Sequence, residues 1–232
     1  MAGQRLMQRF ARWHIWLGWA VGLPVLMWAL TGLWMVARPI EEVRGTHLLG
    51  EPKPVQLAAA PVPPRVEGVP LASLALKQTA AGPRWIATLE DGTARAADPA
   101  TGAWLPEISA IAAVKEVMAR YTGSASVASV SRTDPEKPPL DLRRPIPAWQ
   151  VTLSDGTHFY VDSRSGEIAA TRTRFWRFYD WMWGLHIMDL ETREDTHNPL
   201  IIGFAIISLL TTLLALVMLP LTIRRRRRAR SR

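Results

Sequence analysis

The sequence predicts a membrane protein with two transmembrane α-helices and an α+β domain between them. The first observation is a pair of uncharged apolar segments, Ile15–Ala37 near the start of the chain and Leu200–Ile223 near its end. About 20 apolar residues cross a hydrocarbon core of ~30 Å, so each segment is long enough to span a bilayer. The second observation is a repeated hairpin pattern between the two segments, which is typical of small antiparallel sheets.

Arginines flank both apolar segments on the same side of the membrane. Arg5, Arg9 and Arg12 precede the first segment, and the second is followed by Arg224–Arg228, Arg230 and Arg232. The positive-inside rule therefore places both termini in the cytoplasm and the intervening domain outside it. The first segment is longer than the apolar region of a signal peptide, and no convincing cleavage site follows it. We therefore expect an uncleaved signal anchor and a two-pass protein.

The overall charge of +8, from 28 basic and 20 acidic residues, reflects this topology. The middle of the chain, from Arg38 to Asn198, holds 18 of the basic residues and all 20 acidic ones, a net charge of −2. A run of arginines directly after a membrane segment is typical of an anchor at anionic lipid. We therefore expect the lipid bilayer as a partner and no nucleic acid. The absence of cysteine excludes disulfides and thiolate sites, so any cofactor must use other ligands.

The hairpin pattern occurs twice. The first copy begins at Trp85 and includes Asp98 and Gly102, and the second begins 64 residues later at Trp149. Both copies share W-x-x-T-L-x-D-G-T followed by D-x2-[ST]-G, and Asp-Gly supplies the backbone conformation of a two-residue hairpin. Apolar residues at helical spacing predict a helix over Glu107–Tyr121, and Val127–Ser131 is a further strand candidate. A shorter helix is expected over Leu71–Thr79, ahead of the first hairpin.

The second copy resembles a PepSY domain, in a helix, a variable loop and the ending AWQVTLSDGTHFYVDSRSGEI. The flanking segments resemble PepSY-associated transmembrane helices, through RWHIWLGWAVGL within the first span and WMWGLHIMD ahead of the second. The resemblance implies an extracytoplasmic domain built from two PepSY-like repeats, each a helix on an antiparallel hairpin. Four-pass relatives in this superfamily are implicated in siderophore–iron reduction through b-type haems held by membrane histidines. This chain has two predicted spans, half as many as those relatives.

The expected organisation has eight parts. They are a cytoplasmic N-terminus (1–12), a first transmembrane helix (13–37), a periplasmic Pro-rich linker (38–70), a first PepSY-like repeat (71–106), a second repeat (107–174), an aromatic interfacial segment (175–198), a second transmembrane helix (199–223) and an arginine-rich cytoplasmic tail (224–232). Such a chain belongs in the bacterial inner membrane, with its central domain in the periplasm.

Two histidines are the main candidate ligands to haem iron. His14 lies at the cytoplasmic mouth of the first span, on a face lined with small residues such as Gly18, Gly22 and Gly32. That face could contact either a porphyrin or a neighbouring helix. His186 lies in the aromatic stretch before the second span, where it is either an axial ligand or one more amphipathic side chain at headgroup level. His158 is interpreted as an exposed strand residue.

One haem cannot use both His14 and His186 from one chain, because they lie at opposite faces of a ~30 Å core. His47 and His197, just beyond the spans, are the additional cofactor-binding candidates at the outer face, where they could join His186 within one chain. Two histidine ligands at the His14 position would need a second copy of the helix or a partner subunit, so we expect a homodimer or a complex with another membrane protein. The acids of Asp189–Asp195 form either a cation site or, more simply, a solvated loop.

The sequence contains no hydrolase or nucleotide-binding signature. Three functions remain open on these residues. The first is support of transmembrane electron transfer or reduction in iron and siderophore handling, through haem b, as a component of a reductase system. The second is a non-enzymatic periplasmic protein that binds or regulates a partner such as a protease. The third is an assembly subunit of a redox complex.

Overall fold

The computed structural model describes residues 2–68 and 70–230, with only the backbone given for helix residues 2–8, 11 and 221–230. The chain divides into a helical unit, Met1–Arg38 with Phe178–Arg232, and a central domain, Pro39–Arg177. Arg5 and the tail arginines, which carry the prediction of topology, lie outside the residues whose side chains are described.

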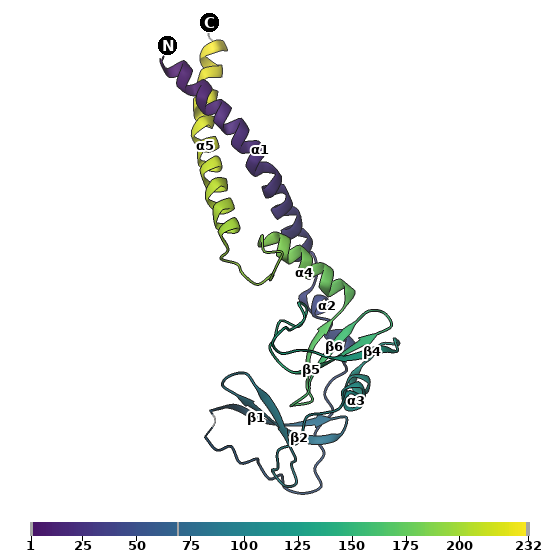
Figure 1. The fold of residues 1–232 in the computed structure, drawn as a ribbon. Helices are drawn as coiled ribbons and strands as arrows, with labels where there is room; N and C mark the ends of the chain where they lie inside the picture. Colours follow the sequence, from purple (N-terminus) through teal and green to yellow (C-terminus); the bar gives the residue numbers. More distant parts are fainter. Residues whose placement is uncertain (1, 69, 231–232) are drawn as a thin grey trace. The chain divides into compact units, whose positions relative to one another are not determined.

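The helical unit contains the two long apolar helices that the sequence predicts. Helix α1 spans Ala2–Val36 and helix α5 spans Pro199–Arg230, each with one internal proline, Pro24 and Pro220. The stretches long and apolar enough to cross a membrane are Arg12–Val36 and Pro199–Pro220, with mean hydropathies of 1.6 and 2.7. The two helices contact each other, and the first turn of α1 lies at the same end of the pair as the last turn of α5 (Figure 1).

The central domain contains two antiparallel sheets, which confirms the α+β class. The first sheet has the order β1-β2-β3, with β1 Leu71–Thr79, β2 Gly82–Leu89 and β3 Ala94–Ala97. The second has the order β4-β5-β6-β7, with β4 Val127–Arg132, β5 Ala148–Leu153, β6 His158–Asp162 and β7 Ile168–Arg172. The short helices α2, Ile40–Arg44, and η1, Thr46–Leu48, precede both sheets.

The predicted helix ahead of the second hairpin is α3, Ala110–Arg120, and it packs on the second sheet. The Ser109 hydroxyl caps it by accepting the Ala112 N–H at 3.3 Å. The buried core between helix and sheet consists of Ala113, Val117, Val151, Leu153, Phe159 and Val161. Burial of these side chains is the main stabilising term of the domain.

The two hairpins of the repeat are confirmed, and their details match. β2 pairs with β3 and β5 with β6, each across an Asp-Gly turn whose glycine, Gly92 or Gly156, has a φ of +81°. In each turn the aspartate carboxylate accepts the N–H two residues later at 2.8 Å. The indole N–H groups of Trp85 and Trp149 both donate to backbone carbonyls at 2.8 Å. The sequence repeat is therefore also a structural repeat.

The helix expected over Leu71–Thr79 is wrong, because this segment is strand β1. Its alanine, leucine, lysine and glutamine residues are good helix formers, but nine residues are too few for an isolated helix to be stable. β1 instead pairs with β2 along its length, from Leu71 opposite Leu89 to Thr79 opposite Gly82. The first repeat is thus a three-stranded sheet without a helix of its own.

Candidate functional site

Helix α4, Arg174–His186, brings one candidate histidine against α1. Within the helical unit, the Trp34 ring of α1 meets the Phe178 ring edge-on at a centroid distance of 4.9 Å. The same indole is tilted against Tyr179 at 5.8 Å. Aromatic pairs in these arrangements stabilise more than their buried area alone. The middle of α4 is therefore held against the end of α1.

The imidazole of His186 lies against two oxygen atoms of α1. Its Nδ1 is 3.1 Å from Thr31 Oγ1 and 3.1 Å from the carbonyl oxygen of Trp28. Thr31 is only 5 % exposed, and its hydroxyl donates its proton to the Met27 carbonyl oxygen at 2.9 Å. Both oxygens near Nδ1 therefore act as acceptors, and Nδ1 carries the ring proton. In the neutral ring Nε2 then keeps its lone pair.

The rings of Trp28 and Trp183 and the close approach of Gly32 also shape the surroundings of His186. We call Trp28, Thr31, Gly32 and Trp183 around His186 the histidine seat. A Cβ at Gly32 would lie 2.9 Å from His186 Cε1, so a larger residue there would displace the ring. The Trp28 indole stacks on the imidazole at a centroid distance of 4.8 Å, and the Trp183 ring is nearly parallel to it at 6.4 Å. The seat therefore fixes both the position and the plane of the imidazole.

The loop that follows α4 is held by its own side chains. Asp189 accepts hydrogen bonds from the N–H groups of Glu191, Thr192, Glu194 and Asp195 and from the Thr192 hydroxyl. These bonds, led by the Thr192 hydroxyl, hold the pKa of Asp189 well below its usual range. Its oxygens are thus committed to the loop, and the described residues contain no group of three metal-ligating side chains in Asp189–Asp195 or elsewhere.

Asn198 joins this loop to both neighbouring helices. Its Nδ2 donates to the carbonyl of Ile187 at 2.9 Å and to that of Asp195 at 2.8 Å. Its Oδ1 accepts the N–H groups of Leu200 and Ile201, both at 3.1 Å, and so caps α5. One side chain therefore fixes the distance between the end of α4 and the start of α5.

His14 occupies a separate position on α1. It precedes Gly32 by 18 residues, which is about 27 Å along a helix. Its side chain is half-buried, and its Nδ1 atom is buried without a hydrogen-bond partner in the part of the chain that the structure describes. A Cβ at Gly18 or Gly22 would meet nothing within 4 Å, so these glycines of the predicted small-residue face are open, whereas Gly32 is covered by His186.

The other two candidates lie in other parts of the chain. His47 is exposed and lies in η1 of the central domain, where its carbonyl accepts the Thr122 hydroxyl at 3.1 Å. His197 is exposed in the loop before α5, and its Nδ1 lies 3.2 Å from the Thr196 hydroxyl oxygen. The structure thus gives defined surroundings to His186 and His14, and leaves the side chains of His47 and His197 at the surface.

His158 is a strand residue as predicted, the first of β6, but it is half-buried, so the predicted exposure is wrong. Its Nδ1 lies 2.9 Å from Asp141 Oδ2, and Tyr160 donates its hydroxyl to Asp141 Oδ1 at 2.6 Å. Burial raises the pKa of Asp141, but the bonds from His158 and Tyr160 outweigh it, and the net pKa is lowered. Burial and the nearby carboxylate raise the pKa of Tyr160. This cluster connects the loop around Asp141, which lies between β4 and β5, to the second sheet.

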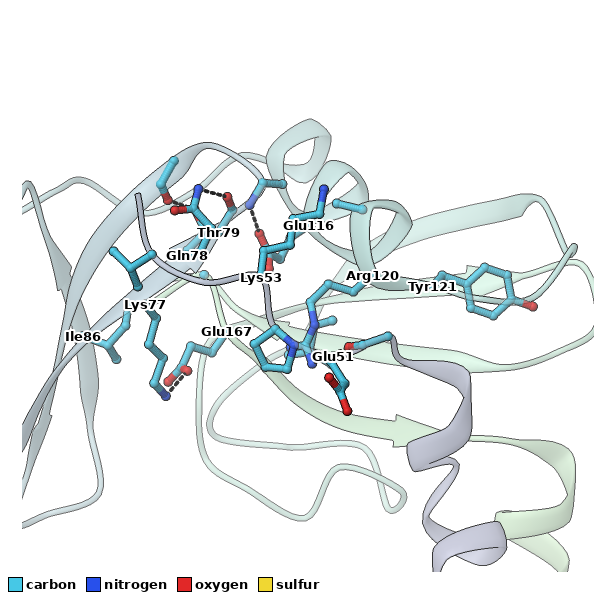
Figure 2. Close-up of a pocket in the computed structure, with 18 of the residues that line it drawn as sticks. Glu51, Lys53, Lys77, Gln78, Thr79, Ile86, Glu116, Arg120, Tyr121 and Glu167 are labelled. Atoms are coloured by element: carbon cyan, nitrogen blue, oxygen red, sulfur yellow. Dashed lines mark hydrogen bonds and ion pairs between the residues drawn. The ribbon is translucent and has the colours of Figure 1, made fainter. Parts of the chain in front are cut away.

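The central domain contains a groove of about 810 Å³ that no motif in the sequence indicates (Figure 2). Its walls are strand β1, the end of α3, the start of β7 and residues 50–53 and 55 of the Pro-rich linker. Charged side chains line it together with an apolar floor that includes Ile86 and Ile168. A volume of this size is within the range of ligand-binding clefts.

Comparison with known proteins bears on the whole chain. The family model of the PepSY-associated TM region matches residues 11–232, which include both apolar helices, the central domain and the histidine seat. No curated protein and no solved structure gives a match to the chain. Because the family model covers nearly all of the sequence, the chain belongs to the PepSY-associated TM family and is a membrane protein with a PepSY-type central region.

Proposed function

We propose that this protein supports electron transfer across the bacterial inner membrane in iron or siderophore reduction, with His186 as an axial ligand to a b-type haem. The observation that carries the proposal is the histidine seat, in which Nδ1 of His186 lies 3.1 Å from two acceptors on α1. Metal-binding histidines typically donate the other ring N–H to a carbonyl or carboxylate, which fixes the tautomer and raises the basicity of the ligand nitrogen. His186 meets this requirement.

The residues of the seat have separate roles in this proposal. The Trp28 carbonyl and Thr31 hydroxyl oxygens hold the Nδ1 proton, and Nε2 presents a lone pair. Gly32 permits the close approach of the ring to α1, and Trp28 and Trp183 fix its plane. Haem, when bound, supplies one-electron transfer at a potential that the axial ligand and its hydrogen bonds adjust.

A second position is needed for transfer across the membrane, and His14 is the candidate for it. Its buried Nδ1 lacks a partner among the described residues, and such a group costs about 1–3 kcal/mol unless it is satisfied. The separation of about 27 Å along α1 means that His14 and His186 serve different irons. Each haem would then need a further ligand from another copy of this chain or from a membrane partner, and at His14 the open Gly18 and Gly22 face would admit it.

We place both termini in the cytoplasm and the central domain in the periplasm, on the arginines that flank the spans. In this orientation His14 lies near the cytoplasmic face and His186 near the periplasmic face. The electron donor is then on the cytoplasmic side and the ferric acceptor on the periplasmic side. This direction suits the reduction of imported ferric complexes.

The test is the absorption spectrum of the full chain, purified in detergent after expression with ample haem. We expect the sharp α-band of a b-type haem after reduction with dithionite. His186→Ala should lose the haem at the outer position and His14→Ala the haem at the inner one, so each removes part of the signal. His158→Gln, a histidine of the central domain that bonds to Asp141, is the matched control and should leave the spectrum unchanged. A spectrum without haem bands, or one that neither variant alters, contradicts the proposal.

A second function is supported by a different observation. The groove beside β1 is a feature that a purely redox role does not require. It favours a protein that binds a partner through its central domain, either as a regulatory protein or as an assembly subunit of a redox complex. Full-length protein that binds a partner equally well with both His14 and His186 replaced would support this second function.

A further inference from the structure

The groove meets strand β1 at its outer edge. Five consecutive residues, Leu76–Ala80, line it, but only Gly82 and Ile86 do so from β2. Successive side chains of a strand point to opposite faces of the sheet. Because consecutive residues line this groove, it runs along the edge of β1 rather than over one face of the sheet. β1 is also the edge of its sheet, in the order β1-β2-β3.

In the described chain no strand pairs with this outer edge of β1. An edge strand presents a row of backbone N–H and C=O groups, which another extended chain can match. The opposite wall is the part of the Pro-rich linker that begins at Gly50, whose N–H donates to the Arg120 carbonyl at 2.7 Å. Between Gly50 and Val62 the described structure gives this linker one hydrogen bond, an exposed one of 3.3 Å from Gln56 N–H to Gln78. The linker therefore borders the groove without pairing with β1.

Some charged side chains in the groove have a hydrogen-bond or ion-pair partner, and others have no partner of opposite charge among the described residues. The carboxylate of Glu116, which is 8 % exposed, accepts the Ala80 N–H at 2.7 Å, and Glu167 forms an ion pair with Lys77. Among the described residues the Arg120 guanidinium has one long bond of 3.4 Å to the Gly50 carbonyl, and its buried Nε has none. Lys53 and Glu51, on the linker wall, have no ion-pair partner among those residues. Arg120, which lies across the groove from β1 (Figure 2), is thus a cation without an anion.

We propose that this groove binds an extended peptide segment of a partner protein, which pairs with the edge of β1 and places a carboxylate at Arg120. The row of unpaired backbone groups selects a peptide over other ligands, because only another backbone matches it in spacing and direction. The apolar floor of Leu76, Ile86 and Ile168 accommodates alternate side chains of the added strand. This inference gives the second function, partner binding, its site and ligand class, and it is independent of the haem proposal.

The experiment uses the full chain in lipid nanodiscs and a displayed library of random short peptides as the probe. Enriched peptides should contain an aspartate, a glutamate or a free C-terminal carboxylate. Arg120→Gln should weaken their binding about tenfold or more, as expected for a hydrogen bond to a charged group. Arg120→Lys, which keeps the charge, should weaken it less. Lys115→Gln is the matched control, since it removes the same charge from the same helix at a residue that does not line the groove.

Hydrogen exchange supplies a second readout that does not depend on the variants. Bound peptide should slow amide exchange in residues 71–79, because the edge N–H groups become bonded. A library without enriched peptides, peptides that bind Arg120→Gln as well as the native chain, or binding without slower exchange in β1 would overturn the proposal. Citrate that displaces the peptides and binds with equal affinity would assign the groove to small carboxylates instead. The absorption spectrum of Arg120→Gln should equal that of the native chain, so failure here is distinct from failure of the haem proposal.

Discussion

Thr31 shows how a single hydroxyl can set the chemistry of a histidine in an apolar environment. Its proton is donated to the helix backbone, so its oxygen faces Nδ1 of His186 only as an acceptor. The sequence identifies His186 as a candidate, but it does not identify Thr31, because the two residues are 155 positions apart and meet only through tertiary packing. Likewise, Gly32 reads as part of a small-residue stripe, and only the structure shows that it makes room for the imidazole.

Replacement of Thr31 by valine keeps its shape and removes one acceptor for the Nδ1 proton. Loss of such a supporting partner typically costs about 10–100-fold in affinity for a metal centre. We expect haem titration of the purified chain to show weaker binding at the outer position by about that factor. Thr211→Val in α5 removes a similar hydroxyl bond to the helix backbone, away from the seat, and should leave the affinity unchanged. Equal affinities in the two variants would contradict the role of Thr31.

Gly32→Ala tests the steric part of the seat. The new Cβ would lie 2.9 Å from His186 Cε1, so the imidazole must shift away from α1. We expect a lower haem-to-protein ratio and an altered reduced spectrum, measured on detergent-purified protein. Gly203→Ala in α5 is the matched control, because a Cβ there meets nothing within 4 Å and the residue lies outside the seat. A normal spectrum for Gly32→Ala would show that the close approach of the ring is not needed.

At the scale of elements, local patterns predicted most of the fold. The apolar segments, the Asp-Gly hairpins and the helix now seen as α3 were all recognisable, because each rests on charge-free length, turn chemistry or helical spacing. Strand β1 was not, because its residues favour a helix and only pairing with β2 makes it a strand. The groove beside β1 was therefore also beyond prediction. The bond between His158 and Asp141 was missed because Asp141 lies in a loop without a regular pattern.

The Asp141 cluster makes the stability of the central domain dependent on pH. Because the folded pKa of Asp141 is lowered, its contribution is fully present above the unfolded value of about 3.9 and is lost as pH falls through the folded value. Asp141→Asn should lower the free energy of unfolding by about 1–3 kcal/mol at neutral pH and reduce its fall in acid. Urea titrations followed by tryptophan fluorescence measure both effects. Asp134→Asn, at an exposed residue of the same loop, should change neither.

At the scale of the whole molecule, the chain belongs to a family of membrane proteins and has two helices long and apolar enough to cross a bilayer. The flanking arginines predict its orientation. In this proposed orientation, the electron donor and acceptor are on opposite faces of the membrane and the groove is open to periplasmic partners. The redox and partner-binding functions use different residues, so one chain can combine them or have only one.

The orientation can be tested cleanly because the chain has no cysteine. A single cysteine at the exposed Ala100 should react with a membrane-impermeant maleimide in cells whose outer membrane is permeabilised. A single cysteine at Ser231, in the arginine-rich tail, should react only after the inner membrane is broken. The reverse pattern would place the central domain in the cytoplasm and contradict the proposed direction of electron transfer.

The most direct test of the central claim is electron transfer across sealed vesicles. Haem-loaded full-length protein is reconstituted with ferricyanide trapped inside and dithionite outside, and the absorbance of ferricyanide is followed. We predict reduction of the trapped ferricyanide that His14→Ala and His186→Ala each slow at least tenfold, while His158→Gln leaves it unchanged. A rate equal to that of protein-free vesicles, or one that both membrane-histidine variants retain, would contradict the claim that this chain conducts electrons through His14 and His186.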